Sequence, residues 1–191
     1  GVESYDTVKT QNGSTAIQFV DETRVDVTPH SKLVIDEFVY DPNTSTGSLA
    51  LKASLGTVRY ASGQIAKNSR QNIKISTPTA VIGVRGTDFS MTVDETGRTT
   101  VILLPSCTLI GSDAVCVTGE ISVESDVGTV ILNKAFQVTT VDTQKSAPLK
   151  PLLLDADATF ISNLIIIRKP VYDEEEMEMN RVKSLTDILG L

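Results

Sequence analysis

The 191-residue chain has no tryptophan, only 5% aromatic residues and a single histidine, His30. Aliphatic side chains must therefore build the core. The many Val, Ile and Thr residues favour strands, because β-branched side chains pack well on a pleated surface. A Ser-His-Asp triad would have to use His30, whose polar surroundings in "VTPHSKL" are typical of an exposed turn. No Gly-x-Ser-x-Gly elbow is present, and we expect no catalytic residues.

Cysteine is also scarce, with only Cys107 and Cys116. Two cysteines and one histidine are too few for a structural zinc site. The two thiols either form a disulfide or stay as buried free thiols, and the sequence leaves both open. Asp155 and Asp157 would share one face of a strand, but two carboxylates without further ligands make a poor metal site. We therefore expect no metal and no cofactor.

Long hydrophobic runs are missing as well. The longest, Leu164–Ile167, predicts a buried strand and is far too short to span a bilayer. The first residues, "GVESYD", lack the basic and apolar regions of a signal peptide. The sequence as given predicts a soluble product without membrane insertion.

Negative charge predominates, with a formal net charge of −7. Such a chain repels phosphate backbones, so nucleic-acid binding is not expected. Basic residues concentrate between Leu51 and Ser90, and acidic residues between Val171 and Leu191. These two regions either pair, within one chain or between copies, or form ordinary solvated surface.

Turn-forming residues divide the chain into short predicted strands. Asn12–Gly13 predicts a tight type I′ hairpin turn, while Asp41–Gly47 and Asp94–Gly97 predict polar turns. Pro105 is expected to end a strand. The stretch "SLALKASLGTVRYASGQIAKNS" begins with a helical composition, but two glycines interrupt it and its middle favours a strand.

One helix is predicted, at the C-terminal end. Its apolar residues follow helical spacing behind an acidic first turn, and the stripe docks on its own domain or on a partner chain. We predict an all-β fold, a rolled or solenoid-like β domain of short strands, with this short amphipathic helix. The expected regions are a β domain (1–145), a proline-containing connector with a buried strand (146–170) and an acidic tail (171–191). The stripe consists of Met179, Val182, Leu185 and Leu189.

The segment "TPTAVIGVRGTDFSM", Thr77–Met91, combines glycines with one basic and one acidic residue. It lacks the Gly-Lys-Ser/Thr ending and the following helix of a phosphate-binding loop. It instead predicts a structural turn between strands, loosened by Gly83 and Gly86. Arg85 and Asp88 would lie on the two sides of this turn and pair across it.

The same segment resembles the signature of the FecR domain family, a Thr-Pro-Thr-Ala sequence followed by an apolar pair and Gly-x-Arg-Gly-Thr. "NGSTAIQFVDETRVDVTPHSKLVIDEFVYDP" and "GTVRYASGQIAKN" are similar to further family motifs, and together the likeness covers about Asp6 to Thr140. The resemblance implies a rolled β domain that binds other proteins and has no catalysis. In the namesake family this domain is the periplasmic part of an anti-sigma regulator.

FecR-like domains also occur in envelope proteins and in tailed phages, and the segment after Cys116 is similar to FecR-like proteins of marine phages. The resemblance thus implies a non-enzymatic component of a larger assembly. We expect a structural protein of a phage virion, in a homo- or hetero-oligomer with other protein subunits. The alternative is a sensor or signalling domain in the periplasm or cell envelope.

Overall fold

The computed structural model describes residues 1–69, 72–110, 113–155 and 167–168. The predicted C-terminal helix with its stripe (Met179, Val182, Leu185, Leu189), most of the run 164–167 and Asp157 lie outside the described residues. The partner-binding role of the stripe and the three-region division therefore stay predictions. The elements are β1 (Thr7–Lys9), β2 (Thr15–Gln18), β3 (Arg24–Val27), β4 (Lys32–Asp41), β5 (Thr46–Ala61), α1 (Gln64–Asn68), β6 (Ile73–Ser76), β7 (Val81–Arg85), β8 (Asp88–Val93), β9 (Thr99–Leu104), β10 (Ser106–Ile110), β11 (Asp113–Val117), β12 (Glu120–Ser125), β13 (Gly128–Leu132), β14 (Gln137–Val141), β15 (Leu152–Leu153) and β16 (Ile167–Arg168).

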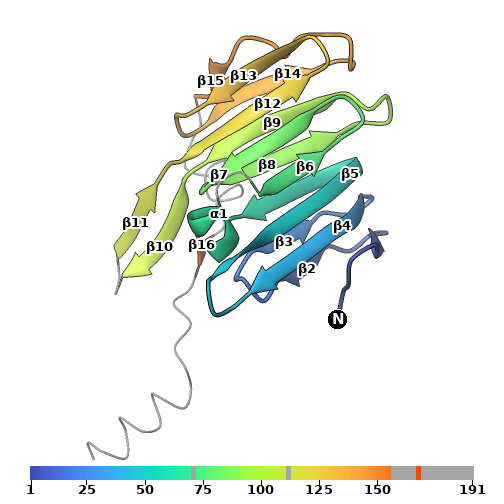
Figure 1. Ribbon diagram of the computed structural model, residues 1–191. Helices are drawn as coiled ribbons and strands as arrows, with labels where there is room; N and C mark the ends of the chain where they lie inside the picture. Colours follow the sequence, from blue (N-terminus) through green and yellow to red (C-terminus); the bar gives the residue numbers. More distant parts are fainter. Residues whose placement is uncertain (70–71, 111–112, 156–166, 169–191) are drawn as a thin grey trace, which may run out of the picture.

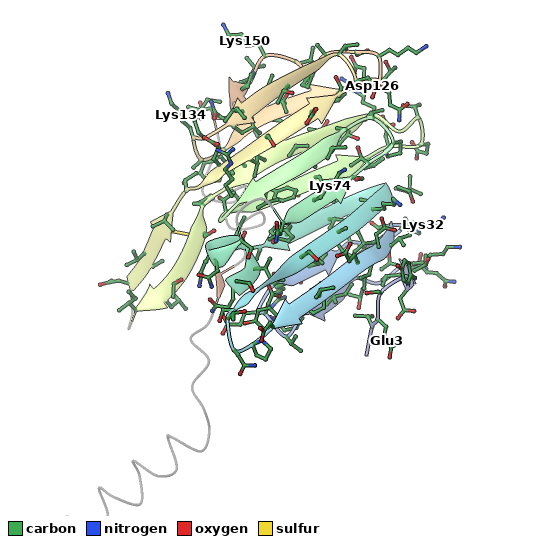
Figure 2. The ribbon with its side chains drawn as sticks, in the orientation of Figure 1. Glu3, Lys32, Lys74, Asp126, Lys134 and Lys150 are labelled. Atoms are coloured by element: carbon green, nitrogen blue, oxygen red, sulfur yellow. A yellow bond between two sulfur atoms is a disulfide. The ribbon has the colours of Figure 1, made fainter. Side chains whose placement is uncertain are left out.

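The predicted all-β fold class is confirmed. Thirteen strands form one continuous sheet that curls on itself, and the described helix is the short α1 (Figure 1). One half of the sheet runs β13-β12-β7-β6-β5-β4-β1 and the other β2-β3-β5-β8-β9-β14-β15. Charged side chains such as Lys32, Asp126 and Lys150 are exposed at the periphery (Figure 2).

The long strand β5 belongs to both halves of the sheet. Its first part, Thr46–Leu55, pairs with β4 and β6, whereas Gly56–Ala61 pairs with β3 and β8. The change of partners falls at Gly56, which has a φ of +86°. Ser31 also lies so close that a Cβ at this position would overlap it. Both the positive φ and the lack of space therefore require glycine at position 56. The bend at this residue lets β5 pair within both halves of the sheet.

The core lies between the two halves, where alternate residues of the strands point inward. Tyr60 and Phe89 are its largest fully buried members, and their rings lie 5.3 Å apart between centroids. Most other core residues are aliphatic, as the shortage of aromatics predicts. They include Val25, Val27, Leu33, Ile35, Leu49, Leu51, Val58, Ile73, Ile75, Ile82, Val84, Met91, Val101, Leu103, Ile121 and Val123.

The hairpin predicted at Asn12–Gly13 is wrong. β1 pairs with β4 and β2 pairs with β3, so the strands on either side of this dipeptide are not partners. Gly13 also lacks the positive φ that a type I′ turn requires. β1 and β2 thus pair with other strands, and not with each other as the local turn signal suggested. By contrast, the predicted turn after Asp41 connects β4 and β5, and the one at Asp94–Gly97 connects β8 and β9.

The region with helical composition is mostly strand. Residues 46–61 form β5, and only Gln64–Asn68 are helical. Alternate burial of Leu49, Leu51 and Ala53 explains this outcome, because period-two burial needs a strand. Tertiary packing has overridden local helix propensity here.

The hairpin β10–β11 leaves the main sheet. Pro105 follows the last residue of β9, as predicted, and the chain then forms a separate sheet of order β11-β10-β16. In Figure 1 this hairpin extends beyond the ends of the neighbouring strands. It returns to the main sheet at β12, which pairs with β7.

Candidate functional site

The signature segment runs through β7 and into β8, and it crosses from one half of the sheet to the other. β7 pairs with β6 and β12, whereas β8 pairs with β5 and β9. The crossing occurs at Gly86 and Thr87, and Gly86 has a φ of +63°. Gly83, predicted to belong to the turn, lies instead in the middle of β7 opposite Lys74 and Ser122. Its missing side chain leaves room for Ser122, whose Oγ would lie 2.6 Å from a Cβ there.

Arg85 and Asp88 have other partners than the ones expected. The Arg85 guanidinium forms an exposed ion pair with Glu120 at 2.8 Å, which joins β7 to β12. Asp88 is fully buried, and its carboxylate accepts a hydrogen bond from the Ser62 N–H at 2.9 Å. The two residues belong to strands in different halves of the sheet. The charged pair predicted across the turn is therefore replaced by contacts to neighbouring elements.

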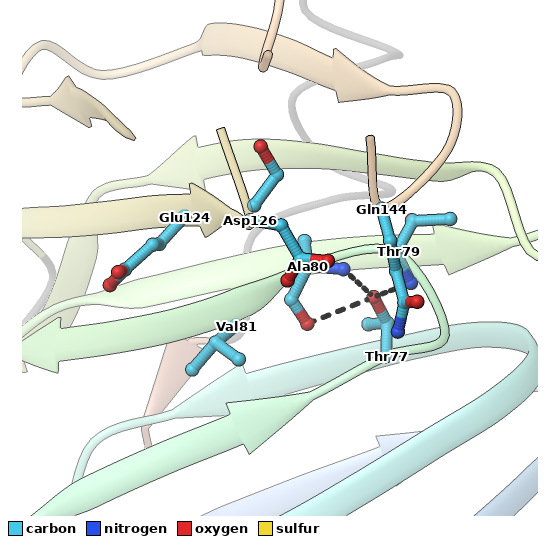
Figure 3. A pocket seen from close by; sticks show the side chains of 8 residues that line it. Thr77, Thr79, Ala80, Val81, Glu124, Asp126 and Gln144 are labelled. Atoms are coloured by element: carbon cyan, nitrogen blue, oxygen red, sulfur yellow. Dashed lines mark hydrogen bonds between the residues drawn. The ribbon is translucent and has the colours of Figure 1, made fainter. Parts of the chain in front are cut away.

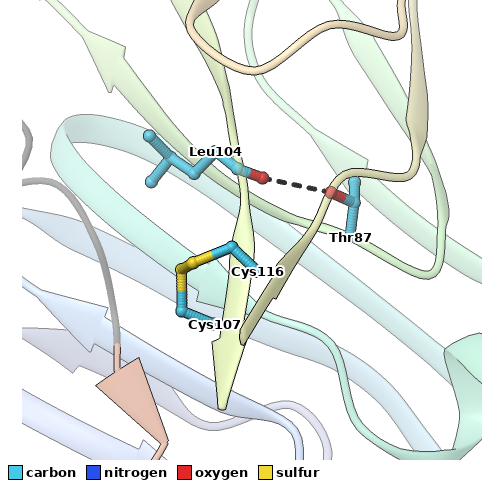
Figure 4. The surroundings of a disulfide bond; sticks show 4 residues. All are labelled: Thr87, Leu104, Cys107 and Cys116. Carbon is cyan, nitrogen blue, oxygen red and sulfur yellow. Dashed lines mark hydrogen bonds between the residues drawn. A yellow bond between two sulfur atoms is a disulfide. The ribbon is translucent and has the colours of Figure 1, made fainter. Parts of the chain in front are cut away.

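Thr87 connects this corner to both ends of the β10–β11 hairpin. Its buried hydroxyl donates to the backbone C=O of Leu104 at 3.2 Å, as Figure 4 shows. The same oxygen accepts a hydrogen bond from the Gly119 N–H at 3.2 Å. Leu104 ends the strand before the hairpin, and Gly119 lies between the hairpin and β12. One threonine of the signature thus fixes where the hairpin leaves and rejoins the sheet.

Gly119 fits this junction because it has no side chain. A Cβ on Gly119 would lie 2.7 Å from the C=O oxygens of both Arg85 and Gly86. Contacts of that length are too short for real carbon atoms, so the two segments can pack this closely only with glycine.

A buried polar group beside the corner fixes the short helix. The Asp21 carboxylate accepts hydrogen bonds from the N–H and hydroxyl of Thr23, at 3.0 and 2.8 Å, and from the Ile65 N–H in α1 at 3.3 Å. Nearby, burial raises the pKa of the Tyr60 phenol well above its ordinary value, and the charges of Asp21 and Asp88 add to this shift. The hydrogen bond from Ile65 to Asp21 holds α1 against the sheet.

The other end of the signature, around Thr77 and Thr79, borders a shallow cavity of about 210 Å³ (Figure 3). The Thr77 hydroxyl accepts a hydrogen bond from the Ala80 N–H at 3.0 Å, which closes the turn before β7. Glu124 and Asp126 also line the cavity. Both acidic residues are exposed, and no group of three or more metal-ligating side chains exists within the described residues.

The two cysteines form a disulfide, which resolves the choice that the sequence left open. Cys107 in β10 and Cys116 in β11 lie directly opposite each other, with their Cα atoms 4.1 Å apart (Figure 4). Cys107 is buried and Cys116 is exposed. The bond joins the two strands of the hairpin close to its junction with the sheet.

The remaining candidates for chemistry lie apart from one another. His30 is exposed in the turn between β3 and β4, with a φ of +56° and its N–H bonded to the Gln11 C=O. Asp155 is exposed beyond β15. The signature residues themselves fix the corner and the hairpin. This role cannot be predicted without knowing the order of the strands. Sequence reasoning also missed Val115 and Val117, because their exposure in β11 is known only from the structure.

This architecture is that of a curled β-sheet domain. The chain belongs to the FecR protein family, whose family model matches residues 6–106, more than half of the chain. The family suggested by the signature is therefore confirmed. It is a regulatory family rather than a family of enzymes. No curated protein matches the chain significantly.

Two solved structures have a similar fold. Both are crystal structures of a proposed anti-sigma factor from Parabacteroides distasonis ATCC 8503, at 2.50 and 1.65 Å resolution. Their TM-scores are 0.56 and 0.55, with 14% sequence identity in each case. The alignments cover 78% of this chain but only 60% of those chains, so this chain spans about three fifths of their length.

The predicted role as a structural protein of a phage virion is wrong. The family match and the similarity to proposed anti-sigma factors favour the alternative, an envelope sensor or signalling domain. Among the described residues, no helix has the length and apolar character needed to cross a membrane.

Proposed function

We propose that this chain is a sensor or signalling domain of the bacterial cell envelope and acts by binding other proteins, without catalysis. The family match over residues 6–106 carries the proposal. FecR-like proteins are envelope or periplasmic sensors, and the structural neighbours are proposed anti-sigma factors.

The disulfide supports a location outside the cytoplasm. Disulfides persist in the periplasm and other oxidising compartments, whereas cytosolic thiols are kept reduced. Cys116 is exposed and would be accessible to cytosolic reductants. A hairpin that depends on the Cys107–Cys116 bond for its shape suits an envelope protein.

A protein-binding surface needs rigid support, and the signature corner supplies it. Thr87 and Gly119 couple the protruding hairpin to the point where the two halves of the sheet meet. A protein bound to the hairpin would thus be held in a fixed orientation relative to the core. Surfaces carried by rigid scaffolds bind at a lower entropic cost than mobile ones.

The test is deletion of the gene in its own bacterium, followed by transcript profiling. We expect a limited set of genes to change together, and complementation with the wild-type gene to restore them. A gene that carries Val127→Lys should restore them as well, because Val127 is exposed in the turn between β12 and β13. An unchanged transcript profile, or a protein that fractionates only with the cytoplasm, would contradict the proposed function.

A further inference from the structure

The β10–β11 hairpin has one occupied edge and one open edge. β16 pairs in parallel with β10, along Cys107 and Thr108. β11 pairs with β10 alone, so its outer edge has no strand partner in the part of the chain that is described. An open edge presents unpaired backbone N–H and C=O groups to other chains.

β11 differs from the other strands in its burial. All five of its residues are exposed, whereas every other described strand of four or more residues has at least one buried residue. Val115 and Val117 share one face with Ile110 of β10, and the three side chains are 51%, 63% and 65% exposed. The hairpin therefore exposes three apolar side chains beside its open edge, on the face that also carries Thr108 and Asp113.

β11 has little that protects this edge. Natural sheets usually block open edges with lysine, proline or a bulge. β11 has the sequence Asp-Ala-Val-Cys-Val, and its regular register with β10 contains no bulge. Asp113 is its only charged residue, and it lies at the first position of the strand.

The disulfide shows which backbone groups face outward. Directly opposed residues of an antiparallel pair lie about 4.5 Å apart between Cα atoms when they are not hydrogen-bonded to each other, and about 5.5 Å when they are. The 4.1 Å separation of Cys107 and Cys116 assigns them to the first kind. The N–H and C=O groups of Cys116 therefore point away from β10, and by alternation so do those of Ala114.

We propose that β11 pairs with β11 of a second copy of this chain, antiparallel, about a two-fold axis at Val115. Ala114 of each copy then exchanges both backbone hydrogen bonds with Cys116 of the other, so every outward-facing group of the strand is used. This register is also the one in which all five residues, Asp113 to Val117, overlap.

Charge and side-chain placement both suit this pairing. Asp113 lies opposite Val117 of the second copy, so the two acidic residues do not face each other. A two-fold axis perpendicular to the sheet keeps Val115 and Val117 of both copies on one face. The two Val115 side chains then face each other at the axis. Such isologous pairing closes at two subunits and does not form fibres.

The disulfide lowers the cost of association, because it holds the hairpin in its bound shape before the copies meet. The paired surface is small, however, and small interfaces are weak. We expect a dimer with a Kd in the range of roughly 10 µM to 1 mM, which forms whether or not the chain has the signalling role.

Sedimentation velocity of the purified 191-residue chain, from about 5 µM to 1 mM, tests the proposal. The wild-type protein should shift from monomer to dimer over this range. Val115→Lys should raise the Kd at least about tenfold, because two lysines would face each other at the axis. Val117→Lys should dimerise about as well as wild type, since its ammonium would face Asp113 of the second copy.

Val127→Lys is the matched control away from the hairpin and should dimerise like wild type. Circular dichroism should show unchanged folding, because all three valines are exposed. A chain that stays monomeric at 1 mM contradicts the proposal and leaves this edge to a different protein. Equal loss of dimer in Val115→Lys and Val117→Lys, or no loss in either, contradicts the two-fold register.

Discussion

The Thr87 hydroxyl accepts a hydrogen bond from the backbone N–H of Gly119 at 3.2 Å, across 32 positions of sequence. This contact joins the family signature to the end of the protruding hairpin. Thr87 of the signature therefore supports the hairpin junction, and each contact around it can be tested separately.

Replacing Thr87 by valine keeps the volume of the side chain and removes its hydroxyl. The Gly119 N–H loses its acceptor, so we expect the free energy of unfolding to fall by about 1–3 kcal/mol. Urea denaturation measures the change. Thr92→Val is the control, since Thr92 is exposed and its hydroxyl contacts that of Thr57 at the surface, and it should stay within about 0.5 kcal/mol of wild type. Equal effects of the two substitutions would contradict the role of Thr87.

Gly119→Ala tests the close packing at the hairpin junction. The added methyl group would lie 2.7 Å from the C=O oxygens of Arg85 and Gly86, and we expect a loss of about 1–3 kcal/mol. Gly13→Ala is a suitable comparison because no atom beyond the adjacent residues lies within 4 Å of the Cβ it would add. That variant should match wild type or be slightly more stable. A Gly119→Ala protein as stable as wild type would show that the junction yields easily.

Tyr60 should make the protein sensitive to alkali. Burial raises the pKa of its phenol, so above pH 10 the unfolded chain releases a proton that the folded chain retains. The free energy of unfolding should then decrease by about 1.4 kcal/mol per pH unit from this group alone. Urea titrations between pH 9 and 11 should show a shallower decrease for Tyr60→Phe. Parallel pH profiles of the two proteins would contradict this account.

Reduction of the disulfide should affect the hairpin more than the core. The main sheet has its own buried cluster, whereas an isolated two-stranded hairpin is marginally stable. We expect hydrogen exchange to speed up in 106–110 and 113–117 after reduction, with little change in the buried strands β5 and β8. Uniformly faster exchange across all strands would instead mean that the bond holds the whole fold together.

The sequence predicted the local features of this fold well. Scarce aromatics and abundant β-branched residues indicated an aliphatic all-β core, and Pro105 marked the end of β9. The polar turns after Asp41 and at Asp94 each connect neighbouring strands. The strand end and the turns depend on residues close together in the chain, and the aliphatic core depends on overall composition.

The features that failed depend on distant residues. The Asn12–Gly13 signal failed because β1 pairs with β4 and β2 pairs with β3. Arg85 pairs with Glu120, which only the β7–β12 register brings close. The role of Gly83 likewise depends on Ser122 in β12. The residue pattern within 77–91 therefore cannot predict these contacts with β12.

The most direct test of an envelope location is the oxidation state of Cys107 and Cys116 in living cells. Cells of the native bacterium are quenched in acid, and free thiols are alkylated with a reagent that retards the protein on a gel. An envelope domain should run as the unmodified species and shift only after prior reduction. A protein with both thiols already alkylated before reduction would place the chain in a reducing compartment and contradict this account.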